Sequence, residues 1–173
     1  MEKVFGATVR NDQLIVHGTG KAVLIYGYGE EDGQGFDYRH VFDHKPSKME
    51  LKEVIDNHIN SLTDEKILNS YPWTVKHGPD EGKTVKVWLS AENKENYKAK
   101  HDAAVIYPDK VKFPTKFKIS EDSAHQPIYE VFENLEELAT FYLGGLAHIE
   151  ECVNDGWAEK DSVDYDALLG VNE

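Results

Sequence analysis

The sequence predicts an α+β fold, in which an N-terminal antiparallel β module (residues 1–45) precedes a small domain of β hairpins packed by three helices (residues 46–173). Three observations predict it. Short β-rich runs alternate with turn residues in the first 45 positions, a helix-capping motif follows Pro46, and hairpin and helix patterns then alternate to the end of the chain. A chain of 173 residues suits one domain, or one small domain with an appended module.

The N-terminal module is predicted to be a four-stranded meander. The runs that favour strands are KVFGATV, LIVH, KAVLIYGY and FDYRHVF. Turn residues separate these runs, at Asn11-Asp12, at Gly18-Thr19-Gly20 and in a loop rich in glycine between residues 29 and 35. Because no part of this module has a helical period, we expect it to contain only sheet.

The first helix is predicted to begin at Ser47, because Ser47 and Glu50 form a capping box. Apolar residues then recur at intervals of three and four, which places them on one face of a helix: Leu51, Val54, Ile55, Ile59 and Leu62. A second, short helical turn is expected between Thr63 and Leu68.

Two hairpins and a helix are predicted in the middle of the chain. The first hairpin joins Trp73-Thr74-Val75 to the run VKVWL through the turn-rich segment HGPDEGK. The second pairs the alternating strand VKFPTKFKI with residues 127–132, and Pro114 places that strand at a sheet edge or a bulge. Between the hairpins, Ser90 is expected to cap a polar helix that runs to about Ala104.

The longest helix is predicted to begin at an Asn134 cap, with Glu137 in its first turn. Its apolar residues again repeat at intervals of three and four: Leu135, Leu138, Tyr142, Leu146, Ile149 and Val153. Gly156 is expected to end the helix in a left-handed conformation. Gly144 and Gly145 each cost about 1 kcal/mol relative to alanine, so either another element approaches closely there or the helix breaks, and we expect the close approach. Tyr165, Leu168 and Leu169 form a candidate docking turn beyond it.

Charge is distributed unevenly along the chain. The formal net charge of −13 disfavours contact with nucleic acid, and the segment 121–173 carries 14 acidic residues against one base, Lys160. This acidic segment is either a solvated helix face balanced by the lysines of the middle segment, or a face that docks a basic partner.

Two sets of residues are the candidate protein interface. The basic set is Lys112, Lys116 and Lys118, and the acidic set is Glu136, Glu137, Glu150 and Glu151. Within one chain the two sets could also pair with each other at the surface, where ion pairs contribute little stability.

No catalytic, metal-binding or cofactor-binding residues are predicted. Gly18 to Lys21 superficially resembles the end of a phosphate-binding loop but lacks the earlier glycine, the hydroxyl after the lysine and the helix. His40 and His44 lie in an extended segment, where four residues span about 13 Å, so they could share a metal only between copies on a symmetry axis. His148 and Cys152 are four apart on a helix, but no neighbour in the sequence would orient the histidine as a base.

The sequence lacks two features that would direct a protein to a membrane or out of the cell. No apolar run approaches the roughly 20 residues of a membrane span, and the N-terminus lacks the apolar stretch of a secretory signal. We therefore expect a soluble protein made in a cytoplasm. The single cysteine excludes a disulfide within the chain.

The middle of the chain resembles a small domain family of bacteriophage and prophage structural genes, often linked to tail-fibre proteins. The features that carry the resemblance are ILNSYPWTV, then VWLSAENKENYKAKHDAAV, then a strand and a closing amphipathic helix. The segment DYRHVFDHKP resembles proteins from phages of gut Bacteroidales. The resemblance covers residues 37–170 and implies a virion component without catalytic residues.

We therefore expect a non-enzymatic structural protein of a tailed-phage virion, in the tail, a tail fibre or another attached part. It would be made in the bacterial host cytoplasm and would assemble with other virion proteins and with copies of itself, without a cofactor, a membrane or direct contact with nucleic acid. The alternative is an acidic inhibitor that mimics nucleic acid and blocks a basic host protein. A hydrolase that uses scattered carboxylates is a third hypothesis, which predicts turnover lost in Glu-to-Gln variants.

Overall fold

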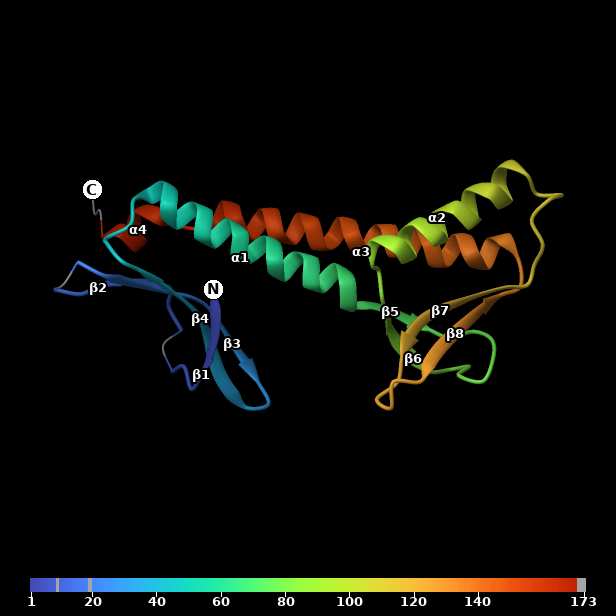
Figure 1. The fold of residues 1–173 in the computed structure, drawn as a ribbon, viewed down its shortest axis with the longest axis horizontal. Helices are drawn as coiled ribbons and strands as arrows, with labels where there is room; N and C mark the ends of the chain where they lie inside the picture. Colours follow the sequence, from blue (N-terminus) through green and yellow to red (C-terminus); the bar gives the residue numbers. More distant parts are fainter. Residues whose placement is uncertain (9, 19, 171–173) are drawn as a thin grey trace. The chain divides into compact units, whose positions relative to one another are not determined.

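The computed structural model describes residues 1–8, 10–18 and 20–170 and confirms the α+β class (Figure 1). The elements in chain order are β1 (Glu2–Phe5), β2 (Gln13–Val16), β3 (Ala22–Glu31), β4 (Gln34–Phe42), α1 (Lys48–Asn69), β5 (Tyr71–Thr74), β6 (Thr84–Val87), α2 (Ala91–Ile106), β7 (Thr115–Glu121), β8 (Pro127–Phe132), α3 (Leu135–Ser162) and α4 (Tyr165–Leu169).

The chain folds into two compact units whose boundaries differ from the expected division after residue 45. The first unit combines residues 1–61 with the segment that begins at Trp157, and the second unit comprises residues 62–156. The physical reason is burial. The N-terminal sheet has one apolar face, and the residues that cover it come from the first half of α1 and from α4. The sheet therefore forms its core with the first half of α1 and with α4.

The sheet of the first unit has the strand order β1-β4-β3-β2. Strands β2, β3 and β4 form the expected meander, whereas β1 pairs with β4, with Phe5 opposite Phe36. Strand β1 ends at Phe5 and is shorter than the predicted run KVFGATV. Gly6 turns the chain there with a φ of 87°, and its amide donates to the Gly35 carbonyl. Val9 and Thr19, which belong to the predicted first strand and second turn, lie outside the described residues.

The core of the first unit lies between the sheet and helices α1 and α4. Alternate residues of β3 point to the same face of the sheet and are buried against one side of α1. A strand repeats its faces every two residues and a helix every 3.6, so each element has one apolar side. The buried residues of this core are Ala22, Leu24, Tyr26, Phe42, Leu51, Ile55, Ile59 and Tyr165. The burial of Tyr165 confirms the docking turn expected after the longest helix.

Helix α1 begins with the predicted capping box. Glu50 accepts hydrogen bonds from the Ser47 amide (2.8 Å) and hydroxyl (2.7 Å), and the first of these bonds is the main reason that the pKa of Glu50 is lowered to about 2. The helix continues without a break to Asn69, where a separate turn was expected from Thr63. No glycine or proline interrupts residues 62–69, so the backbone hydrogen bonds simply continue.

The second unit contains both predicted hairpins. Strands β5 and β6 are antiparallel with Trp73 opposite Val85, and β7 and β8 are antiparallel as well. The hairpins are joined by a hydrogen bond from the Trp88 amide to the Ile119 carbonyl (2.9 Å). Between them, the Ser90 hydroxyl accepts from the Asn93 amide and caps α2, as predicted.

The core of the second unit is aromatic and centres on Phe141 of α3. The ring of Phe141 lies 4.9 Å from Trp73, 5.0 Å from Tyr97 and 5.0 Å from Phe132, so it contacts both hairpins and α2. The other buried members are Tyr71, Val75, Val87, Leu89, Ile119, Ile128 and Leu138.

The prediction that Gly156 ends α3 is wrong, because the helix runs on to Ser162. Gly156 is buried and faces Thr63 of α1, where an added Cβ would lie 2.5 Å from the threonine Oγ1. The glycine is therefore needed for the close approach of two helices and not for a left-handed cap.

Replacing the adjacent glycines Gly144 and Gly145 of α3 by alanine should change the free energy of unfolding in opposite directions. A Cβ on Gly144 would overlap the hydroxyl of buried Tyr71, whereas a Cβ on Gly145 would lie 3.7 Å from the Leu89 side chain in ordinary contact. We expect Gly144→Ala to lower the free energy of unfolding by about 1–3 kcal/mol. Gly145→Ala should raise it by up to about 1 kcal/mol through helix propensity.

Urea unfolding followed by tryptophan fluorescence measures both glycine variants. Equal changes of the same sign in the two variants would contradict the close approach of Tyr71 to α3.

Candidate protein-interaction surface

His148 and Cys152, four residues apart on α3, do lie in contact. The His148 Nε2 is 3.5 Å from the Cys152 Sγ, 3.1 Å from the Ser70 Oγ and 3.5 Å from the Lys66 carbonyl oxygen. All three contacts share one nitrogen, and the ring stacks on Tyr71. Burial raises the pKa of the Cys152 thiol, which favours the protonated, unreactive form. The cluster therefore has the character of a packed helix contact.

Among the described residues, the carboxylate that accepts the most hydrogen bonds is that of Glu130 in β8, which is fully buried. Its Oε2 accepts from the Trp73 indole N–H (2.5 Å) and the Lys76 amide (2.9 Å), and its Oε1 accepts from the His77 amide (3.1 Å) and the Val131 amide (3.1 Å). Sequence reasoning missed this group. The available signal was its inward position in β8, between buried neighbours on the same face of the strand.

His40, His44 and His58 have separate surroundings. His44 bonds to Glu50 through its Nε2 (2.9 Å), and His40 packs on the Phe42 ring. His58 is buried against Tyr38, and its Nε2 has no hydrogen-bond partner in the described part of the chain. Across the described parts of the chain, no group of three His, Cys, Asp or Glu side chains could hold a metal ion. A search of the described helices finds none that is long and apolar enough to cross a membrane.

The three predicted basic residues lie along β7 and the loop that precedes it. The Lys116 Nζ sits 3.9 Å from the centre of the Tyr129 ring, and the Lys118 Nζ lies over Trp88 and bonds to Glu121. Lys112 is exposed in the loop between α2 and β7. Lys116 and Lys118 share the outer face of their hairpin, because residues two apart on a strand point the same way.

The four predicted acidic residues form two pairs on α3. Glu136 and Glu137 lie in the first turn of α3, and Glu150 and Glu151 follow 14 residues later, about 21 Å along the helix axis. Glu137 accepts from the Glu133 amide (2.9 Å), which lowers its pKa, and bonds to His77.

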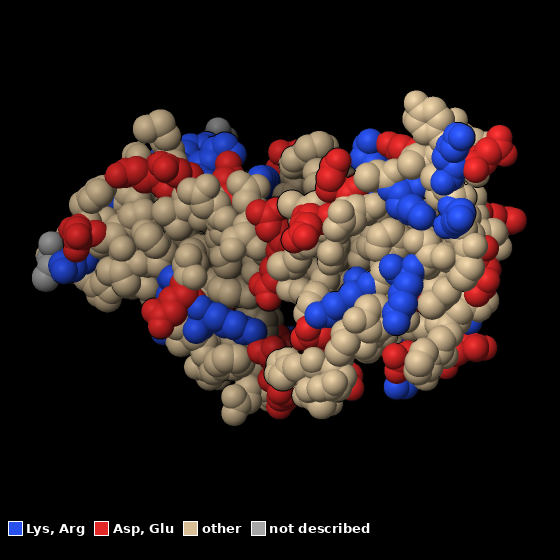
Figure 2. Space-filling view, turned by 45° about the vertical axis from the view of Figure 1, so that its right-hand side comes forward, with Lys and Arg blue, Asp and Glu red and all other residues tan. Residues whose placement is uncertain are grey.

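The basic and acidic sets do not pair with each other. Among the described residues, Lys118 pairs with Glu121 and Glu137 with His77, while Lys112, Lys116, Glu136, Glu150 and Glu151 form no ion pair. Figure 2 shows basic side chains gathered over the second unit, with carboxylates around and between them. These charges are therefore available to a partner.

A groove between α2 and α3 was not foreseen from the sequence. Its volume is about 260 Å³, and its lining includes Leu89, Ala91, Tyr142, Leu146 and Ile149. Exposed apolar side chains stand beside it and at the end of α2: Val105, Ile106, Tyr107, Leu143 and Leu146. The signal available in the sequence was the run Val105-Ile106-Tyr107, which continues a polar helix with three apolar residues.

No protein-family model, curated protein or solved structure matches this chain.

Proposed function

We propose that the protein is a non-enzymatic structural protein that acts by assembly with copies of itself and with neighbouring proteins. The observation that carries this proposal is the surface of the second unit, which carries exposed apolar side chains, a groove, and lysines and glutamates that form no ion pair among the described residues. Complementary charges set partner choice and register, and apolar side chains supply affinity.

The chemistry of the polar clusters supports a role in contact more than in turnover. Glu130 is enclosed by four N–H donors and is fully buried, so it lies beyond the reach of a substrate. The His148 Nε2 faces a buried thiol, a hydroxyl and a carbonyl, and among the described residues no carboxylate bonds to the other ring nitrogen, Nδ1, from which a base is oriented. A general base requires a partner that orients it.

The proposed setting is the virion of a tailed phage, in the tail, a tail fibre or another attached part. The resemblance of residues 37–170 to phage structural genes motivates this setting. A virion part must pack many copies in fixed register, which favours surfaces with charges of both signs left unpaired.

The experiment is mass spectrometry of gradient-purified particles from the source that encodes the protein. We expect the chain to be present at a defined copy number relative to the other virion proteins. Its repeated absence from intact particles would overturn the virion setting. Salt-sensitive capture of a basic host protein, with no virion protein bound, would favour the acidic inhibitor instead.

A further inference from the structure

Strand β2 forms one edge of the N-terminal sheet and presents backbone groups with no partner among the described residues. The His17 amide donates to the Lys21 carbonyl (2.8 Å), so the odd-numbered residues of β2 bond to β3. Bonds alternate along an antiparallel ladder, so the N–H and C=O groups of Leu14 and Val16 point away from β3. No described residue bonds to these groups, because β3 is the one strand that pairs with β2. Such an edge can accept a further strand.

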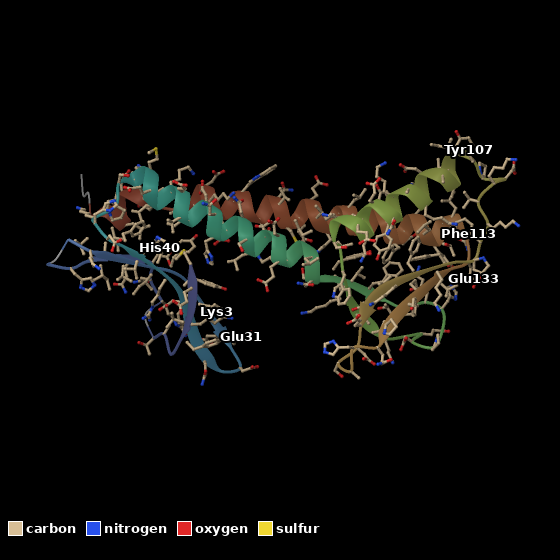
Figure 3. The ribbon with its side chains drawn as sticks, in the orientation of Figure 1. Lys3, Glu31, His40, Tyr107, Phe113 and Glu133 are labelled. Atoms are coloured by element: carbon tan, nitrogen blue, oxygen red, sulfur yellow. The ribbon has the colours of Figure 1, made fainter. Side chains whose placement is uncertain are left out.

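This edge lacks the residues that usually protect an exposed strand, which are charges, prolines or bulges. The sequence of β2 is QLIV, and its register with β3 is continuous. Ile15 and Val16 are 39% and 46% exposed. The opposite edge, β1, does carry charges, Glu2 and Lys3, and the Lys3 Nζ bonds to Glu31 at 2.6 Å (Figure 3). The β2 edge is therefore the one suited to a partner strand.

A row of β-branched residues crosses the face of the sheet that points away from the core and ends at this edge. Ile15 of β2 lies opposite Val23 of β3, and Val23 lies opposite Val41 of β4. Leu24 is buried in the core, and its neighbour Val23 therefore points to the other face of the sheet. Val41 is 62% exposed. The row is an apolar stripe that stops where β2 has no neighbour.

The core-facing side of the same edge also has space for apolar side chains. A cleft of about 270 Å³ lies between β2 and α4, and its lining includes Leu14, Val16 and Leu168. The side chains that an added strand pointed to this side would meet a hollow and not a closed surface.

We propose that the β2 strands of two copies pair antiparallel about a two-fold axis between their Ile15 residues, which joins the two sheets into one. This inference rests on the proposed function and names the partner as a second copy. Leu14 of each copy lies opposite Val16 of the other, and each such pair exchanges two backbone hydrogen bonds. The contact uses the same patch on both copies, so it closes at a dimer.

The apolar row favours a second copy as the partner and selects the register. With Ile15 on the axis, the row continues from Val41 of one copy to Val41 of the other, because both copies carry the same stripe. The register with Leu14 on the axis also bonds the outward groups, but it sets Ile15 against Gln13 and interrupts the row. Paired β-branched residues stabilise neighbouring strands.

The expected strength of this contact is low. Two strands of four residues bury far less than the roughly 1,200 Å² of a stable interface. Copies held together in one particle compensate through their high effective concentration.

Sedimentation velocity of the full chain tests the contact, at protein concentrations up to about 1 mM and in about 1 M salt. Charges are screened beyond about 3 Å in this salt, so contacts that depend on surface charge are weakened. We expect a monomer–dimer equilibrium without larger species, because the contact closes at two copies.

Two substitutions should weaken dimerisation about tenfold or more. Ile15→Lys places two like charges opposite each other on the axis. Val16→Pro removes an outward N–H that has no partner in the described part of one chain, so the sheet itself loses no bond. The matched controls are Val41→Lys, at the far end of the row, and Val16→Thr, which keeps the N–H. Both should dimerise within about threefold of the unmodified chain, and circular dichroism verifies that every variant is folded.

A cysteine on the axis tests the register. Opposed residues of a non-hydrogen-bonded pair have Cα atoms about 4.5 Å apart, within reach of a disulfide. In a Cys152→Ala background, oxidised glutathione should therefore join Ile15→Cys chains into a covalent dimer. Gln13→Cys lies opposite His17 in this register and should cross-link about tenfold more slowly.

Three results would overturn the contact: a monomer at every concentration in 1 M salt, normal dimerisation of Ile15→Lys and Val16→Pro, or equal cross-linking of the two cysteine variants. Association that appears only at low salt would remove this contact and leave the proposed function standing. The same holds for a chain that forms no dimer but binds a neighbouring protein through β2. A monomer at every salt concentration that binds no protein encoded beside it would remove both.

Discussion

Glu130→Leu is expected to lower the free energy of unfolding by about 3–5 kcal/mol, the largest effect of any single substitution considered. The carboxylate accepts four hydrogen bonds in a fully buried position, and two of the donors are the amides of Lys76 and His77 at the start of the β5–β6 loop. The donors remain when the carboxylate is removed, so an apolar replacement leaves the buried Trp73 indole N–H and the part-buried amides without their acceptor.

Glu136→Leu is the matched control for this substitution, because Glu136 is exposed in the first turn of α3 and accepts no side-chain bond among the described residues. Its unfolding free energy should change by no more than about 0.5 kcal/mol. Urea titrations of both variants, followed by tryptophan fluorescence, make the comparison. Equal stability of Glu130→Leu and the unmodified chain would show that the carboxylate does not hold the loop.

The protein should lose about 3 kcal/mol of stability as the pH falls from about 6.5 to about 4, through the titration of His58. Burial, followed by the nearby positive N-terminus, lowers the pKa of His58 from 6.5 to about 4. The folded state therefore binds this proton less readily than the unfolded state. The stabilising difference is fully present above pH 6.5 and is lost as the pH falls toward the folded pKa.

His58→Leu tests this titration directly. The variant should be as stable as the unmodified chain or more so at pH 7, because no described residue hydrogen-bonds to the imidazole Nε2. Its stability should fall less between pH 6.5 and 4.5. His17→Leu, at an exposed position, is the control and should keep the full pH dependence. Identical pH profiles for His58→Leu and the unmodified chain would exclude His58 as the titrating group.

Local patterns were enough to predict most of the elements. Ser47 with Glu50, Ser90, and Asn134 with Glu137 cap their helices as predicted, because capping depends on residues only three apart. The hairpins follow from alternation and turn composition.

The errors in the fold prediction concern contacts between segments distant in the sequence. The sequence of residues 1–10 does not indicate that β1 pairs with β4, because β4 lies about 30 residues further along the chain. Gly156 has the local features of a helix end, yet Thr63 of another helix explains it. At Gly156 the close approach of α1 to α3 requires the glycine, and the tendency of glycine to end a helix has no effect there.

The candidate interface residues stay a prediction. Lys112, Lys116, Glu136, Glu150 and Glu151 form no ion pair among the described residues, and the two acidic pairs lie about 21 Å apart along α3. The groove was missed because it arises where α2 meets α3, and the periods of the two helices do not give their separation.

The central claim is that this molecule acts by contact. The most direct test is the molar mass of the purified full chain by light scattering, measured as concentration rises and salt falls, with and without the proteins encoded beside it. We predict a mass that rises above the 19.7 kDa of one chain and falls again in high salt. A mass fixed at 19.7 kDa under every condition, with no partner bound, would contradict the account.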